Sequence, residues 1–227
     1  MQYTVDFVAI GRDRAYTGGM SFRDRQAAGA ALYRPLAGYA SAPTLVVVGL
    51  VRGGVPVAAE LARRLGAPLD ALVVRKLGVP WAPEVAFGAL GPGGVCVLNN
   101  DIAAGLPVDS INRVVRRETA ELASRERRYR AGLPPLDLRG RIALLVDDGL
   151  ATGASARAAV AVARRLGAER VVVAAPVGSP QAVDELRLVA DDVVCPVQPD
   201  DFTAVSRWYD DFTQVDDAAV VELLVGG

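Results

Sequence analysis

The sequence predicts an α/β fold in which a parallel β-sheet core is flanked by helices, with a small additional subdomain. Two observations lead to this fold class. The 227 residues, of which 52% are hydrophobic, suffice for one large domain or for a core with a small appendage. Residues 44–76 and 141–177 each contain an apolar run, a glycine-containing loop, an alanine-rich stretch and a second apolar run. Each segment therefore predicts a βαβ unit with parallel strands.

The N-terminal part of the chain divides into two pieces. Residues 1–20 are expected to form an extension that the fold does not need. A helix is expected to follow, with Ser21 as its N-cap and Asp24 completing a weak capping box. The main core is predicted to span residues 21–200.

The first βαβ unit starts with the run at residues 44–50, "TLVVVGL". Its continuous β-branched character is typical of a strand buried on both faces. The turn "VRGG" leads to a helix with Pro56 in its first turn and Gly66 at its end. The segment "PLDALVVRK", residues 68–76, is predicted as the second strand.

A less regular region and a charged helix separate the two units. Residues 78–100 are rich in Gly and Pro and predict a long loop followed by a short antiparallel pair. Residues 109–130 predict a charged helical insertion, in which Glu121 and Arg125 have the favourable i,i+4 spacing. Its arginines are interspersed with acids, which favours a solvated helix face over a nucleic-acid site.

The second βαβ unit repeats the plan with "RIALLVDD", "GLATGAS", "ARAAVAVARRLGA" and "ERVVVAAPV". Its loop and the "VRGG" turn both follow the carboxyl ends of predicted parallel strands. The two loops should therefore share one edge of the sheet, where ligands bind in open α/β sheets. Residues 201–227 are expected to form a C-terminal segment and a helix.

Composition excludes several kinds of function. The 25 basic and 26 acidic residues give a net charge of -1, so no general attraction to nucleic acid or to a membrane is expected. The chain has no histidine, which excludes Ser-His-Asp triads and nearly all catalytic zinc sites. Cys96 and Cys195 lie in valine-rich runs and are predicted to be buried free thiols. With neither a membrane-spanning stretch nor a signal peptide in the sequence, a cytoplasmic protein is expected.

The stretch Leu144–Ser155, "LLVDDGLATGAS", carries the clearest chemistry. Backbone N–H groups of Ala151–Ser155, ahead of a helix, can bind a phosphate. Asp147 and Asp148 would repel a phosphate, but they can accept hydrogen bonds from sugar hydroxyls or hold a metal through them. An acid pair that only caps the helix is the simpler alternative, although a cap needs a single acid. A sugar phosphate fits the whole stretch better.

This stretch resembles the phosphoribosyl-pyrophosphate (PRPP) signature of type I phosphoribosyltransferases. The resemblance implies that Asp147 and Asp148 act at the ribose. It also implies that the loop binds the 5-phosphate through Ala151, Thr152, Gly153, Ala154 and Ser155.

Two further segments are similar to that family. The "VRGG" turn resembles its pyrophosphate loop, which implies that Arg52, Gly53 and Gly54 bind pyrophosphate. The segment "VVRKLGVP" resembles an Arg-Lys pair at a strand end, implying pyrophosphate binding by Arg75 and a catalytic role for Lys76. Taken alone, a solvated strand end would explain this pair equally well. The following residues, 78–88, fall where the family has a flexible lid.

The resemblance extends from Phe22 to the C-terminus and includes "FRDR", "RGGVPVA" and "WYDDF", as in stand-alone bacterial members of the family. It implies a small hood subdomain over the base. Phe202, Trp208 and Tyr209 are candidates for base binding, together with Phe212, unless they only pack the hood.

The resemblance implies an acceptor class and a reaction. Hypoxanthine-guanine members have an acid at the position of Ala151, and "LATG" is closer to the adenine-type loop, which suggests purine salvage. The expected reaction transfers the phosphoribosyl group from PRPP to a nitrogenous base with release of pyrophosphate. Mg²⁺ would be held mainly through PRPP, near Asp147 and Asp148, and a homodimer is expected. A regulator that senses PRPP or a nucleotide, and a hydrolase, are the alternatives.

Overall fold

The computed structural model describes residues 21–40, 42–130 and 132–226. The predicted N-terminal extension, residues 1–20, lies outside these ranges. No helix in the described part of the chain is long and apolar enough to cross a membrane.

A five-stranded parallel sheet forms the centre of the molecule, with the strand order β2-β1-β6-β7-β8. This sheet confirms the predicted fold class and both predicted βαβ units. Its strands are β1 (Leu45–Leu50), β2 (Leu69–Leu72), β6 (Ile142–Val146), β7 (Arg170–Ala174) and β8 (Asp192–Val194).

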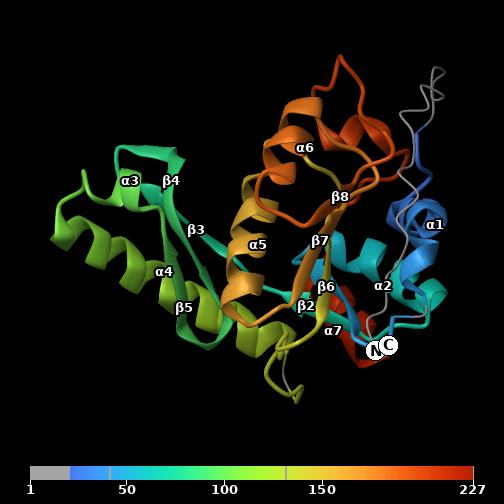
Figure 1. Cartoon of the computed structure of the whole chain (residues 1–227), viewed down its shortest axis with the longest axis horizontal. Coiled ribbons are helices and arrows are strands. Elements are labelled where there is room, and N and C mark those ends of the chain that lie inside the picture. The colour runs from blue at the N-terminus through green and yellow to red at the C-terminus, as the bar shows by residue number, and fades with distance from the viewer. Residues whose placement is uncertain (1–20, 41, 131, 227) are drawn as a thin grey trace.

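Helices cover both faces of this sheet (Figure 1). In β1, Val46 and Val48 pack toward α5 and α6, while Val47 faces α1 and α2. The strand therefore needs apolar side chains at every position, because successive residues point to opposite faces. The covering helices are α1 (Arg25–Leu36), α2 (Gly54–Leu65), α5 (Ala154–Arg165) and α6 (Pro180–Arg187).

The start of α1 differs from the prediction. The N-cap is Asp24 rather than Ser21, and its carboxylate accepts a hydrogen bond from the Ala27 amide at 2.7 Å. Ser21 instead donates a hydrogen bond to Asp210. An aspartate at this position satisfies one of the amides that the first helical turn leaves without an intrahelical partner.

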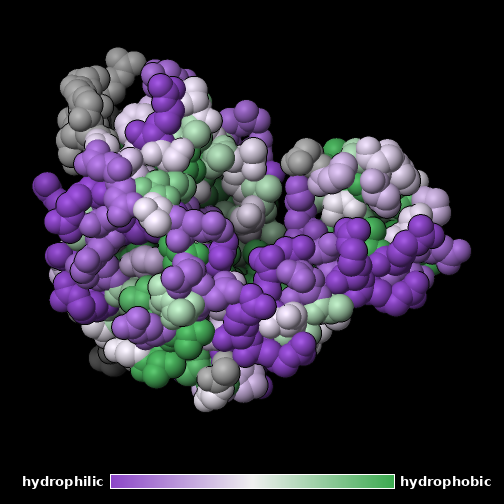
Figure 2. Space-filling view, turned by 180° about the vertical axis from the view of Figure 1, so that it is seen from behind, coloured by the Kyte–Doolittle hydropathy of each residue, from purple (hydrophilic) through white to green (hydrophobic). Residues whose placement is uncertain are grey.

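A second, antiparallel sheet projects from the core as a lobe together with two helices (Figure 1). Seen from behind, a notch separates this lobe from the main body (Figure 2). The lobe consists of β3 (Arg75–Val79), β4 (Ala82–Gly91), the single 3₁₀ turn η2 (Pro92–Gly94), β5 (Val95–Leu98), α3 (Asn100–Ala103) and α4 (Val108–Tyr129).

Two predictions in this region are wrong. The segment predicted as a long loop is mostly the ten-residue strand β4, whose Phe87 is fully buried between the lobe sheet and α4. The strand predicted over residues 68–76 ends at Leu72, and the chain enters the other sheet at Arg75. The partner strand β1 ends at Leu50, which pairs with Leu72, so the parallel ladder has no further partner there.

The helix α4 confirms the predicted charged helix. Val114, Glu118 and Leu122 lie on one buried stripe of it, at the spacing of an amphipathic helix. Arg125 donates to Glu121 at 2.8 Å on its outer side, as the spacing predicted.

The start of the described chain contacts the segment around Tyr209. The amide of Phe22 donates to the carbonyl of Trp208 at 2.7 Å, and Phe22 packs with Tyr209. A short helix, η3 (Val205–Trp208), and the final helix α7 (Asp217–Val225) complete the C-terminal region, and another short helix, η1 (Ala37–Tyr39), follows α1.

Candidate functional site

The two predicted loops lie side by side at one edge of the central sheet. They follow β1 and β6, which are neighbouring parallel strands in register from Leu45↔Ile142 to Gly49↔Val146. A side chain at Gly53 would overlap the carboxylate of Asp148, and one at Gly54 would overlap the carbonyl of Val146. The glycines of the "VRGG" turn therefore allow the backbone to approach the acidic pair directly.

Asp147 and Asp148 have different surroundings despite being adjacent. The Asp147 carboxylate accepts a hydrogen bond from the Asp148 amide at 2.9 Å. Burial and the neighbouring Asp148 charge raise the pKa of Asp147 well above its usual range. Burial also raises the pKa of Asp148, although an ion pair with Arg25 opposes this shift. Burial thus disfavours a charge on both acids, and the ion pair with Arg25 offsets this effect mainly at Asp148.

Asp148 is held by two residues that are distant from it in the sequence. Its Oδ2 accepts a hydrogen bond from Arg25 Nε at 2.9 Å, and its backbone carbonyl accepts one from the Tyr209 hydroxyl at 2.6 Å. Arg25 is the first residue of α1, and Tyr209 directly follows η3. The position of Asp148 therefore depends on both the start of α1 and the residue that follows η3.

The phosphate loop predicted at Ala151–Ser155 leads into the twelve-residue helix α5, whose first two residues are Ala154 and Ser155. Gly153 occupies the N-cap with a φ of 67°, in the left-handed region, and the Thr152 hydroxyl accepts a long hydrogen bond from the Ala154 amide at 3.4 Å. Ala151, Thr152 and Ser155 are exposed. The first amides of α5 have no intrahelical acceptor, so this end of the helix can bind an anion.

Ser179, the N-cap of α6, holds the loop that begins at Ala151. Its hydroxyl donates to the Ala151 carbonyl at 2.7 Å and also accepts the capping hydrogen bond from the Ala182 amide.

The second helix start at the site is that of α2, whose N-cap is Gly53, without a side-chain cap. The peptide bond between Val51 and Arg52 in this turn is cis.

A hollow of about 370 Å³ opens between the turn, the acids and the C-terminal segment. Two arginines, one acid and an aromatic ring contribute to its wall. It is lined by Arg25, Arg52, Gly53, Asp148, Phe212, Gln214 and Val215. The hollow combines positive charge with backbone groups of the turn, a combination suited to a phosphorylated ligand.

Arg75 and Lys76 do not end a strand of the central sheet, because β2 stops at Leu72, three residues before Arg75. Both belong to β3 of the lobe. Arg75 forms an ion pair with Glu118 of α4 at 2.6 Å, and the Glu118 side chain is only 8% exposed. The structure thus gives Arg75 a partner within the lobe.

The aromatic residues predicted to bind a base pack mainly with one another. Tyr209 is buried and supports Asp148, while Phe202 and Trp208 are half-buried in the same cluster. Of the four candidates only Phe212 lines the hollow. Arg25 and Gln214 were not predicted, although Arg25 lies in the "FRDR" segment.

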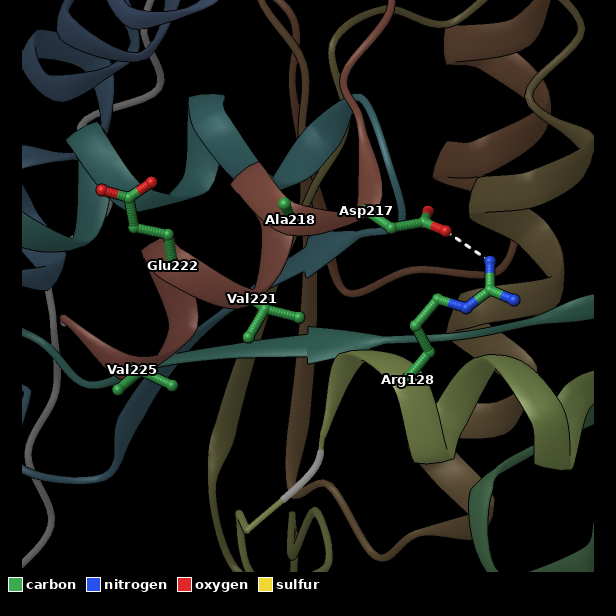
Figure 3. Close-up of a pocket in the computed structure, with 6 residues that line it drawn as sticks. All are labelled: Arg128, Asp217, Ala218, Val221, Glu222 and Val225. Atoms are coloured by element: carbon green, nitrogen blue, oxygen red, sulfur yellow. Dashed lines mark hydrogen bonds and ion pairs between the residues drawn. The ribbon is translucent and has the colours of Figure 1, made fainter.

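A larger hollow of about 490 Å³ lies along α7 (Figure 3). It is lined by Arg128, Asp217, Ala218, Val221, Glu222 and Val225, and Figure 3 shows the ion pair between Arg128 and Asp217 beside it. None of the lining residues belongs to the two loops. Oδ1 of Asp217 also lies 3.6 Å from Nη1 of Arg52, so this ion pair connects α7 to the turn.

The donor set suits a metal that arrives with its ligand. In the parts of the chain that the structure describes, no group of three or more His, Cys, Asp or Glu residues could hold a metal ion. Two adjacent carboxylates do fit Mg²⁺, which keeps several non-protein ligands and binds through one or two carboxylates together with phosphates of a substrate.

Comparison with known proteins agrees with this geometry. A family model described as "Phosphoribosyl transferase domain" matches residues 26–213. The chain therefore belongs to the phosphoribosyl transferase family.

Individual relatives support the same assignment. The chain is 50% identical over 205 residues to "Putative phosphoribosyl transferase Rv0571c" of Mycobacterium tuberculosis strain H37Rv, and equally to the counterpart in strain CDC 1551. These matches cover 89% of the chain but only 46% of each relative, so the chain spans about half the length of the curated relatives it matches. The crystal structure of TT1426 from Thermus thermophilus superposes with a TM-score of 0.86 at 46% identity, covering 91% of this chain and 99% of the other.

Proposed function

We propose that the chain transfers the 5-phosphoribosyl group from PRPP to a ring nitrogen of a nitrogenous base, with Mg²⁺ and with release of pyrophosphate. One observation carries the proposal: the acidic pair, the start of α5 and the "VRGG" turn meet at one sheet edge, and Gly53 packs directly on Asp148. PRPP has three parts that match these three elements, a 5-phosphate, ribose hydroxyls and a pyrophosphate.

In this proposal each element of the site binds one part of PRPP. The amides of Ala151–Ser155 bind the 5-phosphate at the start of α5. Asp147 and Asp148 accept hydrogen bonds from the ribose hydroxyls. Arg52 and the amides of Gly53 and Gly54 bind the pyrophosphate. When bound through PRPP near the two acids, Mg²⁺ would supply positive charge that offsets the negative charge of the pyrophosphate.

The chemical step then needs mainly positioning and electrostatics. The bond from ribose C1 to the pyrophosphate oxygen breaks, a bond from C1 to the ring nitrogen forms, and the ring nitrogen gives its proton to water. Positive charge develops on the ribose, near the carboxylate of Asp148, while negative charge grows on the pyrophosphate, near Arg52. This division of roles requires no histidine.

The acceptor is proposed to be a base that needs no acidic residue at position 151. Ala151 is exposed in the loop and cannot accept a proton. Because an adenine-type acceptor agrees with the "LATG" loop, adenine is expected to react in preference to hypoxanthine or guanine. The hood residues Phe202 and Trp208 are retained as the proposed contacts to the base.

The proposal is tested by measuring pyrophosphate release with PRPP, Mg²⁺ and a panel of nucleobases. We expect release that depends on one class of base and ceases when Mg²⁺ is chelated. PRPP binding without release for any base would contradict the transferase function and favour a PRPP-sensing regulator. Release of pyrophosphate without any base would indicate hydrolysis.

A further inference from the structure

The hollow beside Asp148 contains a cation that the sequence motifs leave without a role. Arg25 and Arg52 both line it, from α1 and from the turn after β1. Arg75, the other arginine that the sequence assigned to pyrophosphate, is bound to Glu118 in the lobe. The structure therefore offers Arg25 in the place where a second cation was expected.

The Arg25 side chain is held in a defined position and is only 11% exposed. Its Nε donates to Asp148 at 2.9 Å and its Nη1 donates to the Thr213 carbonyl at 2.8 Å. Its guanidinium carbon lies 4.0 Å from the centroid of the Phe212 ring, a cation–π distance. Within residues 21–40, 42–130 and 132–226, Nη2 has no acceptor, so this end of the fork remains available to a ligand.

The ion pair with Asp148 conflicts with the role proposed for that acid. If ribose hydroxyls and Mg²⁺ engage the Asp148 carboxylate, Arg25 loses much of the compensation for its charge. A largely buried guanidinium without an anion is unfavourable. Pyrophosphate would restore the balance, because guanidinium binds phosphate oxygens through parallel N–H donors.

We propose that Arg25 is a pyrophosphate-binding residue that exchanges the Asp148 carboxylate for phosphate oxygens of PRPP when ribose hydroxyls bind Asp148. The inference rests on the proposed function, since it takes PRPP as the ligand. Phe212 and Thr213 hold the guanidinium within the hollow during this exchange, so only its hydrogen-bond partner changes.

Isothermal titration with inorganic pyrophosphate and Mg²⁺ tests this role. Arg25→Ala should weaken pyrophosphate binding about tenfold or more, the effect of a lost charge-assisted hydrogen bond. Arg25→Lys keeps the charge but loses the fork, and an intermediate loss is expected. Arg23→Ala is the matched control, because its side chain is 74% exposed and pairs with Asp24; pyrophosphate affinity should stay within about twofold.

A double-mutant cycle separates pyrophosphate binding from mere support of Asp148. In buffer without Mg²⁺, Asp148→Asn should raise pyrophosphate affinity because it releases Arg25. The same change in an Arg25→Ala background should give a smaller gain. If Arg25 only positions Asp148, the two gains will be equal and Arg25→Ala alone will not weaken pyrophosphate binding.

Circular dichroism and thermal melts establish that each variant is folded. If Arg25→Ala fails to fold, the variant with both Arg25→Ala and Asp148→Asn lacks the unpaired charge and is compared with Asp148→Asn alone. Folded variants lacking Arg25 that bind pyrophosphate as tightly as their parents overturn this inference and leave the proposed function intact. Wild-type protein that binds neither pyrophosphate nor PRPP overturns both.

Discussion

Asp147 and Asp148 show how two identical side chains acquire different properties from their neighbours. Among the residues that the structure describes, the Asp147 carboxylate has a backbone amide as its one hydrogen-bond donor, whereas that of Asp148 has the guanidinium of Arg25. The raised pKa of Asp147 leaves it largely protonated where an exposed aspartate is ionised, while Arg25 favours the charged form of Asp148. We infer that negative charge at this pair is favoured more at Asp148 than at Asp147.

This difference predicts how stability depends on pH. The folded chain retains the Asp147 proton above the pH at which the unfolded chain loses it, so the free energy of unfolding falls as pH rises from about 4 through the raised pKa. Asp147→Asn cannot lose a proton and can still accept the Asp148 amide. Urea denaturation at about pH 5 and about pH 8 should show the wild type losing at least about 1 kcal/mol relative to this variant. Parallel pH profiles for the two proteins would show that Asp147 has an ordinary pKa.

Gly53 provides a test of the contact between the two loops. Gly53→Ala would place a methyl group on the Asp148 carboxylate, which must then move. We expect PRPP affinity, measured by titration calorimetry, to fall about tenfold or more, equivalent to about 1.4 kcal/mol. Gly38→Ala is the matched control, since a Cβ atom there meets nothing within 4 Å. Equal PRPP affinity in the two variants would mean that the turn and Asp148 do not share a ligand.

At the scale of elements, an ion pair as well as apolar packing joins the sheet of the lobe to α4. Glu118 lies on the buried face of α4 and receives Arg75 from β3 and Arg117 from its own helix. Arg75 is 28% exposed in its side chain and Arg117 73%, so Arg75 is the partner that compensates the buried carboxylate. The ion pair therefore connects the two layers of the lobe.

This assignment predicts that Arg75 matters for stability more than for ligand binding. Arg75→Ala should lower the free energy of unfolding by about 2 kcal/mol or more, because a mostly buried charge loses its main partner. Arg117→Ala should cost less than about 1 kcal/mol. Urea denaturation and PRPP titration of both variants provide the comparison. A large loss of PRPP affinity in Arg75→Ala with unchanged stability would return Arg75 to the pyrophosphate site that the sequence suggested.

The elements that the sequence predicted well are those whose pattern has a single explanation. The strands β1, β6 and β7 are apolar at nearly every position because both faces are covered, and the helix α2 ends at Gly66, which has a φ of 63°. The break between β2 and β3 could not be predicted, because the run Leu72–Val74 is apolar throughout and gives no sign that β2 ends at Leu72. Only the end of the neighbouring strand β1 determines where the ladder stops.

At the scale of the whole molecule, the site is assembled from parts distant in the chain. The acids and both loops were predictable, because each motif is continuous in sequence. The pair between Arg25 and Asp148 spans 123 positions, and no local pattern indicates it. The hydrogen bond between Phe22 and Trp208 joins the start of the described chain to the segment before α7, which explains why the site includes residues from both.

In the whole molecule, the "VRGG" turn and the acids with the start of α5 follow the neighbouring parallel strands β1 and β6. The family assignment agrees with this arrangement, and the curated relatives contain roughly as many further residues as this chain matches. The proposed activity uses only residues of this chain, at its own sheet edge.

Titration of PRPP in the presence of Mg²⁺ into wild-type protein and into the variant with both Asp147→Asn and Asp148→Asn tests the central claim most directly. Circular dichroism and thermal melts are recorded for both proteins. We predict that wild-type protein binds PRPP and that the variant, still folded, shows no measurable binding, because the ribose hydroxyls and Mg²⁺ lose their carboxylate acceptors. PRPP affinity that is unchanged in the folded variant would contradict the assignment of this sheet edge as the PRPP site.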